Sequence, residues 1–148
     1  MKLSRVERWM VVNQMRILEA LYPDEAKSIA EHREALEQGY ELHYGEFAQH
    51  IYDDEDTLSV EGCKEVLNIL SMHQALKRAY DKLPDKSGIE EYRVRFAGFD
   101  GNDSVEGTMM AYTRWFCDSH GGRFKDLDRG DDFNSHALML DSYRAMLK

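Results

Sequence analysis

Two short segments combine aromatic residues with polar side chains that could carry chemistry. Residues 96–103 read FAGFDGND, and residues 133–136 read FNSH. In each segment a phenylalanine, Phe99 or Phe133, can anchor the backbone in the core. We therefore expect the two segments to pack together and to form one polar cluster, whose members are Asp100, Asn102, Asn134 and His136.

The chemistry of such a cluster depends on what surrounds it. A buried carboxylate needs hydrogen-bond donors or a cationic partner, and His136 could be that partner for Asp100. Beside an open cavity, the cluster could serve an enzyme of unknown reaction or bind a small ligand. The same side chains could instead cap two helix starts, whose free N–H groups suit carboxylates and amides. We favour mutual capping over a ligand site, and the sequence identifies no catalytic residue.

The first segment also begins like a calcium-binding EF-hand loop. Asp100, Asn102 and Ser104 place oxygen ligands at the first, third and fifth positions of such a loop. The sixth position, which requires glycine, is Val105, and the twelfth, which requires a bidentate glutamate, is Ala111. The loop therefore predicts a turn into a helix that Asn102, Asp103 or Ser104 can cap, rather than a calcium site.

A second candidate for metal binding lies earlier in the chain. His43, Glu46 and His50 have the spacing of one helix face, and such a trio could hold zinc with one coordination position open. A short helix with a solvated polar face explains the same residues, and we favour that interpretation. We expect no metal and no cofactor.

The elements that must position these residues are indicated by apolar spacing. Ser4 and Glu7 fit a capping box, in which each side chain satisfies a backbone N–H at a helix start. In the helix that follows, the residues of one face recur at gaps of three and four, and they are Val6, Met10, Asn13, Ile17 and Leu21. If this face is buried, the amide of Asn13 must find a partner, and we expect it to bind a loop.

Further helices follow at short intervals. Asp24 can cap a second helix, which ends at Gly39. A short helix is expected around residues 44–51, and a solvated acidic loop at Asp53 to Asp56. Ser59 can cap a long helix to about Leu83. His73 lies on the apolar face of that helix, where a histidine is usually satisfied within the core.

The C-terminal third combines one extended segment with two helices. In residues 92–96, apolar or aromatic side chains alternate with arginines, which is the spacing of a strand. A single short strand without a partner is unstable, so we expect an extended connector. Ser104 can cap a helix that ends at Gly121, and the last helix is expected from about His136 to Leu147. The sequence thus predicts an all-α fold, with five or six helices in a single domain over residues 1–148.

Composition limits the partners of the chain. It has 148 residues, 43% of them hydrophobic, and a net charge of −9. Residues 44–65 carry seven acidic side chains and one basic side chain. This negative charge argues against a DNA-binding helix-turn-helix motif, because such a motif has to approach the phosphates of DNA. No apolar run approaches the roughly 20 residues of a membrane span, and the N-terminal residues lack an apolar signal core. We expect a cytoplasmic protein that binds neither nucleic acid nor membrane, with Cys63 and Cys117 reduced.

Four segments together resemble the YfbU family of bacterial proteins. They read ERWMVVNQ, VLNILSMHQAL, FAGFDGND and FNSHALMLDSYRAML, and the resemblance runs in order from about Ser4 to Leu147. Family members often carry methionine and proline after the NSH histidine, where this chain has Ala137 and Leu138. The resemblance implies a mainly helical fold and a bacterial cytoplasmic setting, but it supplies no reaction. Some relatives carry an additional DNA-binding segment, which implies a ligand-sensing or regulatory role for the shared domain.

Three functional hypotheses remain open at this stage. The leading one is a binding or regulatory module that self-associates and senses a small-molecule ligand. The alternatives are an enzyme that uses the cluster near Asp100 and His136, and a structural protein-interaction domain. The absence of GxSxG, HExxH and phosphate-binding glycine motifs lowers the expectation of an enzyme. The 43% hydrophobic content and eight methionines favour a homo-oligomer, most simply a two-fold dimer.

Overall fold

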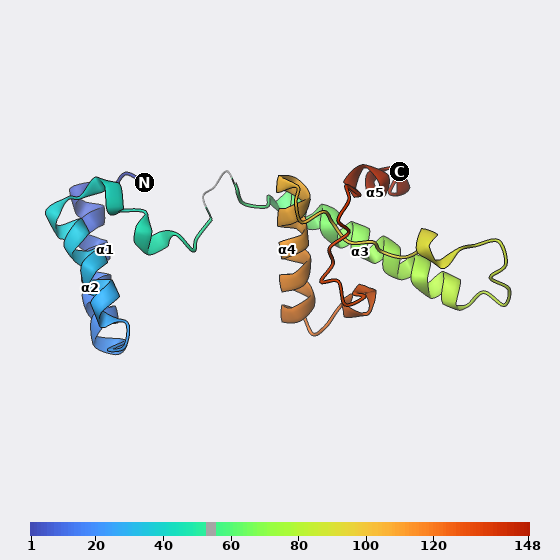
Figure 1. Cartoon of the computed structure of the whole chain (residues 1–148), viewed down its shortest axis with the longest axis horizontal. Coiled ribbons are helices and arrows are strands. Elements are labelled where there is room, and N and C mark those ends of the chain that lie inside the picture. Colours follow the sequence, from blue (N-terminus) through green and yellow to red (C-terminus); the bar gives the residue numbers. More distant parts are fainter. Residues whose placement is uncertain (53–55) are drawn as a thin grey trace. The chain divides into compact units, whose positions relative to one another are not determined.

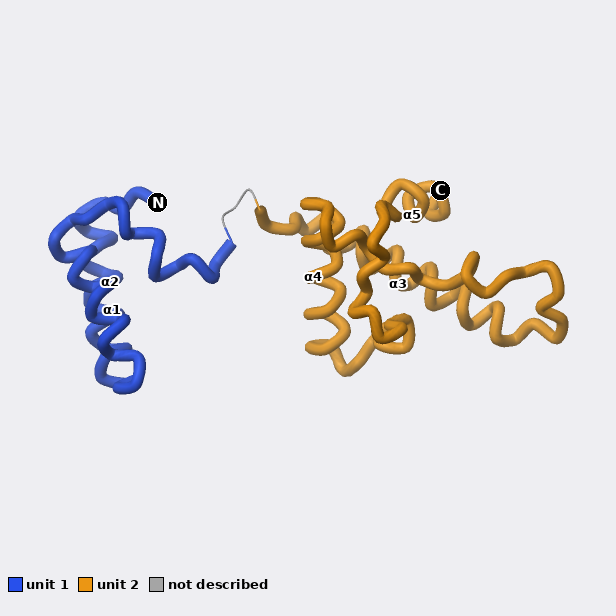
Figure 2. The backbone as a smooth tube through the Cα atoms, in the orientation of Figure 1, with its two compact units in different colours: residues 1–54 blue, residues 55–148 orange. Residues whose placement is uncertain are grey.

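The computed structural model describes residues 1–52 and 56–148, and they divide into two compact units (Figures 1 and 2). Unit 1 is Met1–Asp54 and unit 2 is Glu55–Lys148. The structure confirms the all-α prediction, because the described residues form helices, turns and loops and no named strand. Of the acidic run expected as a solvated loop, Asp53, Asp54 and Glu55 lie outside the described residues, and Asp56 is exposed.

Unit 1 is built on two helices that pack along each other, α1 (Arg5–Leu21) and α2 (Ala26–Gln38) (Figure 1). The predicted capping box is present at the start of α1. The backbone N–H of Ser4 donates to the Glu7 carboxylate at 2.7 Å, and the Ser4 hydroxyl accepts the Glu7 N–H at 3.3 Å. Gly39 ends α2 in the left-handed region, as predicted. The cap expected from Asp24 is wrong, because Glu25 occupies the N-cap position without a side-chain hydrogen bond.

The core of unit 1 corrects the predicted orientation of α1. Its buried residues are Val12, Met15, Leu36 and Tyr44. The face expected to be buried points away from α2, since Val6, Met10, Ile17 and Leu21 are all exposed. Helix α1 carries apolar residues on two sides, and α2 covers only one of them. Asn13 makes no side-chain hydrogen bond within the described part of the chain, so the expected tie to a loop is absent there.

The segment after α2 is less helical than predicted. Two short 3-10 helices, η1 (Glu41–His43) and η2 (Glu46–Ala48), replace the single helix expected over residues 44–51. His43 Nδ1 still lies 2.7 Å from the Glu46 carboxylate. His50 lines a separate groove together with residues of α1 and α2. Within residues 1–52 and 56–148, no three metal-binding side chains converge.

Unit 2 contains the longest helix of the described chain. Its elements are α3 (Val60–Asp81), η4 (Glu91–Arg93), α4 (Ser104–Ser119), η5 (Lys125–Leu127) and α5 (Leu140–Met146). Ser59 caps α3 as predicted, accepting the Gly62 N–H at 3.0 Å. The buried core joins Ile69 of α3 to Phe116 of α4, and it includes aromatic side chains from the loops, namely Phe96, Phe99, Phe124 and Phe133.

The cap of α4 is Asp103, one of the three candidates predicted, because the Asp103 carboxylate accepts the N–H groups of Val105 and Glu106 at 2.9 and 2.8 Å. Two other local predictions for unit 2 are wrong. The segment 92–96, expected to be an extended connector, is helical at its start, because Tyr92 and Arg93 belong to η4. The last helix starts at Leu140, because His136 has a φ of +53°, which α-helical backbone does not adopt.

Candidate functional site

The FAGFDGND and FNSH segments lie side by side. The N–H of Phe99 donates to the carbonyl of Phe133 at 2.9 Å, and the N–H of Ser135 donates to the carbonyl of Phe99 at 3.0 Å. Gly98 makes this approach feasible. Its φ is +97°, and a Cβ atom there would overlap the Phe133 carbonyl oxygen.

The predicted polar residues bind the backbone of these two segments. The Asn134 side-chain oxygen accepts the N–H groups of Gly101 at 3.2 Å and His136 at 3.0 Å. The Asp100 carboxylate accepts both the backbone and the side-chain N–H of Asn102, at 3.0 and 3.1 Å. Asp100 and His136 share no hydrogen bond or ion pair among the described residues, and the His136 side chain is exposed. The structure thus brings the segments together without the expected carboxylate–imidazole contact.

The carboxylate at the centre of this region belongs to Glu106, in the first turn of α4, which was not among the four predicted cluster residues. Glu106 is 2% exposed. One oxygen accepts the N–H of Asp100 at 2.8 Å. The other accepts the N–H groups of Met139 and Leu140 at 2.8 and 2.7 Å. Glu106 therefore joins α4, the FAGFDGND segment and the start of α5.

Glu106 had one signal in the sequence. It lies three residues after the cap of α4, where a glutamate usually reaches back to the backbone N–H of the cap residue. In this chain the N–H of Asp103 donates to the carbonyl of Asp100 instead, at 3.2 Å. The carboxylate is therefore free to accept N–H groups from elsewhere in the fold.

An aromatic group supports the same segments from within the core. The Tyr143 hydroxyl donates to the carbonyl of Gly98 at 2.9 Å and accepts the N–H of Ala97 at 3.2 Å. Burial raises the pKa of Tyr143 far above its ordinary value, so the hydroxyl keeps its proton. The ring of Tyr143 lies 5.0 Å from that of His73, edge to face.

His73 is in the core, as predicted, but only one of its nitrogens is satisfied. Nδ1 donates to the carbonyl of Val94 at 3.2 Å. Nε2 is buried and has no partner among the described residues. Burial lowers the pKa of His73 because the charged form loses its hydration, which favours the neutral ring in the folded protein.

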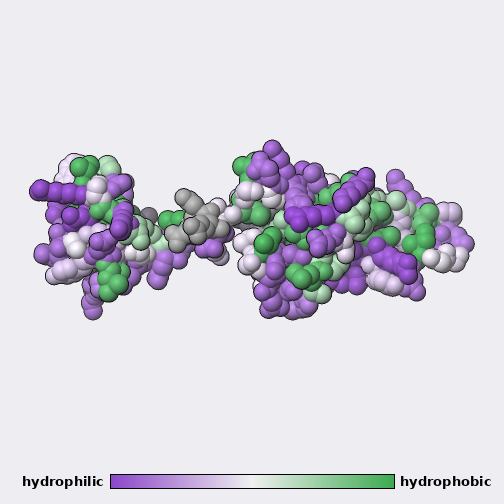
Figure 3. All heavy atoms as spheres, turned by 90° about the horizontal axis from the view of Figure 1, so that it is seen from above, coloured by the Kyte–Doolittle hydropathy of each residue, from purple (hydrophilic) through white to green (hydrophobic). Residues whose placement is uncertain are grey.

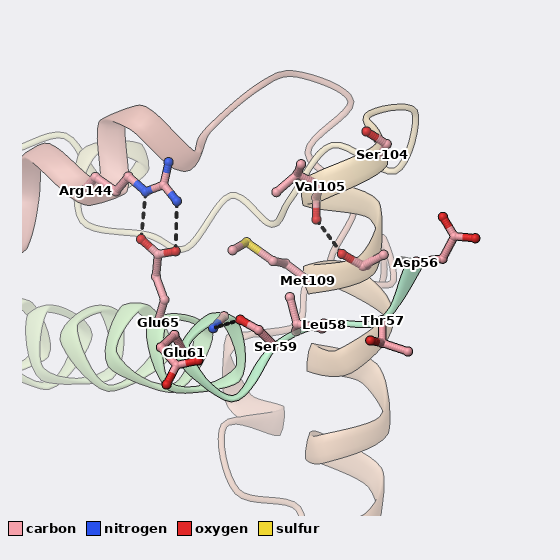
Figure 4. A pocket seen from close by; sticks show the side chains of 12 residues that line it. Asp56, Thr57, Leu58, Ser59, Glu61, Glu65, Ser104, Val105, Met109 and Arg144 are labelled. Carbon is pink, nitrogen blue, oxygen red and sulfur yellow. Dashed lines mark hydrogen bonds and ion pairs between the residues drawn. The ribbon is translucent and has the colours of Figure 1, made fainter. Parts of the chain in front are cut away.

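A separate cleft of about 670 Å³ opens in unit 2 (Figure 4). The starts of α3 and α4 form two walls, and Arg144 of α5 reaches in from a third side. None of the four cluster residues predicted from the sequence lines this cleft. Its lining is mixed, with apolar, hydroxyl, acidic and basic members such as Met109, Thr108, Glu61 and Arg144.

Only some of the charged side chains that line the cleft form ion pairs with other described residues. The Arg144 guanidinium makes a bidentate pair with Glu65, at 2.7 and 3.0 Å. This pairing lowers the pKa of Glu65 and raises that of Arg144. Asp56 and Glu61 line the same cleft, so acidic side chains outnumber the single guanidinium. The cleft therefore offers a negative surface beside the apolar side chains of Leu58 and Met109.

Together, the fold and this site define an all-α protein with a cleft of small-molecule size between helix starts. None of the helices that the structure describes combines the length and the apolar character that crossing a membrane requires. The YfbU domain model matches residues 1–148. The chain therefore belongs to the YfbU domain family, which confirms the resemblance carried by its four sequence segments.

Proposed function

We propose that the protein is a binding or regulatory module that binds a small molecule in the cleft of unit 2. The cleft volume of about 670 Å³ is the observation that supports this role. Ligand pockets in proteins commonly enclose roughly 300–1,000 Å³ and combine apolar walls with a few polar groups. The cleft matches this description in both respects.

The charges of the cleft favour a particular class of ligand. The carboxylates of Asp56 and Glu61 have no ion-pair partner among the described residues. A ligand with a protonated amine could pair with them, while its apolar part contacts Leu58 and Met109. A ligand that carries only negative charge would meet repulsion. We therefore propose a small amine with an apolar body.

Binding there could act on α5. Glu65 belongs to α3 and Arg144 to α5, and their ion pair lies at the cleft. An amine that contacts Glu65 would compete with Arg144 for the carboxylate. Ligand binding would then favour a state in which α5 is held less firmly, which is how differential affinity produces regulation.

The remaining parts of the proposal come from the sequence. We propose a cytoplasmic homo-oligomer that does not bind nucleic acid, in keeping with the net charge of −9. The enzyme alternative has weaker support, since the Asp100 carboxylate organises its own loop and His136 is exposed. The protein-interaction alternative is supported by the exposed apolar side of α1.

A thermal-shift screen of small metabolites tests the ligand proposal. A ligand that binds only the folded state at about 100 times its Kd adds about 2.7 kcal/mol to the free energy of unfolding. We expect amines to raise Tm, and we expect Glu61→Gln to reduce that rise. The matched control is Glu31→Gln on the surface of α2, which should leave the rise unchanged. A rise in Tm that Glu61→Gln and Glu65→Gln both leave intact would overturn the assignment to this cleft.

A further inference from the structure

The side of α1 that points away from α2 is apolar and lacks a partner within unit 1. Val6, Met10, Ile17 and Leu21 on this side are between 48% and 66% exposed. Trp9 and Leu18, which are 66% and 41% exposed, lie at its two edges, beside grooves that also border α2. The surface view shows hydrophobic residues among the hydrophilic ones of this unit (Figure 3). Asn13 and Gln14 lie in the middle of the same helix, and their amides make no hydrogen bond with another described residue.

Unit 1 also has a small core for its size. Four of its described residues form the buried core, and four more hydrophobic side chains pack partly buried against them. Units of about 50 residues are marginally stable by themselves, and association is a common way to bury more apolar surface. An apolar helix side left in water is therefore a strong candidate for an interface.

The residues on this side of α1 are arranged symmetrically about the midpoint between Asn13 and Gln14. The six apolar residues form three pairs, and the two members of each pair are equally far from that midpoint: Val6 with Leu21, Trp9 with Leu18, and Met10 with Ile17. A two-fold interface requires such self-complementarity, since each residue of one copy meets its counterpart on the other.

The charged side chains in the middle of α1 are used on its other side, because they bind α2. Arg8 donates to the carbonyl of Leu36, Arg16 pairs with Glu37, and Glu19 pairs with Arg33. The outward side is left to the apolar residues and the two amides. In an antiparallel pair of α1 helices the two helix dipoles are opposed, whereas a parallel pair would align them.

We propose that a second copy of this chain covers this side of α1, with the two α1 helices antiparallel about a two-fold axis between Asn13 and Gln14. Asn13 then lies opposite the partner's Gln14, so the amides that lack partners hydrogen-bond across the axis and set the register. The two α1–α2 hairpins form a four-helix arrangement, with the α2 helices outside. This inference deepens the self-association proposed above by naming the surface that carries it.

The mass of the full-length chain in solution provides the first test. Light scattering at tens of micromolar should give a dimer. Ile17→Asp places one charge on each side of the axis and should shift the mass to that of a monomer. Ile17 is exposed in unit 1, so the variant should keep its helical circular dichroism spectrum. The matched control is Leu42→Asp, at a residue 88% exposed outside α1, which should remain dimeric.

Cross-linking provides the second test, because it reports the direction of the helices. In the proposed register, residue 13 of each copy lies close to the axis, within the roughly 7 Å between Cα atoms that a disulfide allows. Residue 6 and its counterpart are 15 residues apart along the axis, or about 22 Å. With Cys63→Ser as background, Asn13→Cys should form a disulfide-linked dimer under mild oxidation, and Val6→Cys should not.

Each result of these two tests would contradict a different part of the proposal. A monomer mass for the unaltered chain would overturn both self-association and this interface. A dimer that Ile17→Asp leaves intact would overturn the interface alone, as would cross-linking through residue 6 in place of residue 13. If Ile17→Asp does not fold, the two cysteine variants decide the matter. None of these outcomes bears on ligand binding in unit 2, which the thermal-shift screen tests separately.

Discussion

The carboxylate of Glu106 accepts the backbone N–H of Leu140, 34 residues later in the chain, at 2.7 Å. The same oxygen accepts the N–H of Met139, and the other oxygen accepts that of Asp100. A charge buried in this way is tolerated because all three donors point at it. Glu106 thus caps a helix to which it does not belong.

Glu106→Gln should destabilise the protein strongly. Glutamine keeps one acceptor oxygen but turns an NH₂ group toward backbone N–H donors, which leaves buried groups unsatisfied. We expect a loss on the order of 1–3 kcal/mol in the free energy of unfolding, measured by urea denaturation. Glu31→Gln, at an exposed site on α2, is the matched control and should change stability little. A loss as small as that of the control would contradict the central role of this carboxylate.

Asp100→Asn should cost less than Glu106→Gln. The Asp100 carboxylate accepts the N–H of Asn102 at 3.0 Å, and an asparagine oxygen can keep that bond. We expect a loss of about 0.5–1.5 kcal/mol, since a charged acceptor becomes a neutral one. Urea denaturation of both variants in parallel gives the comparison. Unchanged stability combined with loss of a ligand would instead favour a binding role for Asp100.

The stability of the protein should depend on pH through His73. Burial depresses the pKa of this histidine below its ordinary value of 6.5, so the unfolded chain takes up a proton more readily than the folded one. The contribution of the neutral ring is fully present above pH 6.5 and is lost as pH falls through the lower, folded pKa.

Comparison of the wild type with His73→Phe isolates this effect. Phenylalanine does not titrate, so the variant should lose less stability between pH 7.5 and pH 5 than the wild type loses. His136→Gln, a surface histidine, is the control and should follow the wild type. Parallel pH profiles for the wild type and His73→Phe would show that protonation of His73 is not coupled to folding.

The ion pair between Glu65 and Arg144 should contribute little to stability, despite its bidentate geometry. The Arg144 side chain is 48% exposed, so water and salt screen the attraction. A double-mutant cycle with Glu65→Gln and Arg144→Met should give a coupling of at most about 1 kcal/mol at low salt. Raising the salt concentration to about 1 M should reduce it. A larger coupling that salt does not change would indicate a pair shielded from water.

Local signals predicted the helix starts better than they predicted the contacts between segments. Ser4 and Ser59 cap their helices as expected, because a cap involves residues only three positions apart. The pairing of FAGFDGND with FNSH was also expected, from the aromatic anchors Phe99 and Phe133 in each segment. The contacts of Glu106 with Met139 and Leu140 span a similar separation but leave no comparable trace, because no aromatic anchor or spacing marks them.

Two errors have clear physical causes. Apolar periodicity identified a face on α1, but it did not reveal which of the two apolar sides α2 would cover. The last helix starts later than predicted because the left-handed backbone at His136 breaks the helical path, and no glycine marks that position. In both cases the deciding factor was the arrangement of neighbouring segments, which periodicity does not encode.

Because α5 is short, we expect it to unfold together with another segment of unit 2. At seven residues, α5 is below the length at which a helix persists alone in water. Its first N–H groups are held by Glu106, and Tyr143 on the same helix holds the backbone at Ala97 and Gly98. Unwinding of α5 must therefore release the 97–101 loop as well. Amide hydrogen exchange in these two regions, distant in sequence, should proceed as one cooperative event rather than as separate fraying of a terminus and a loop.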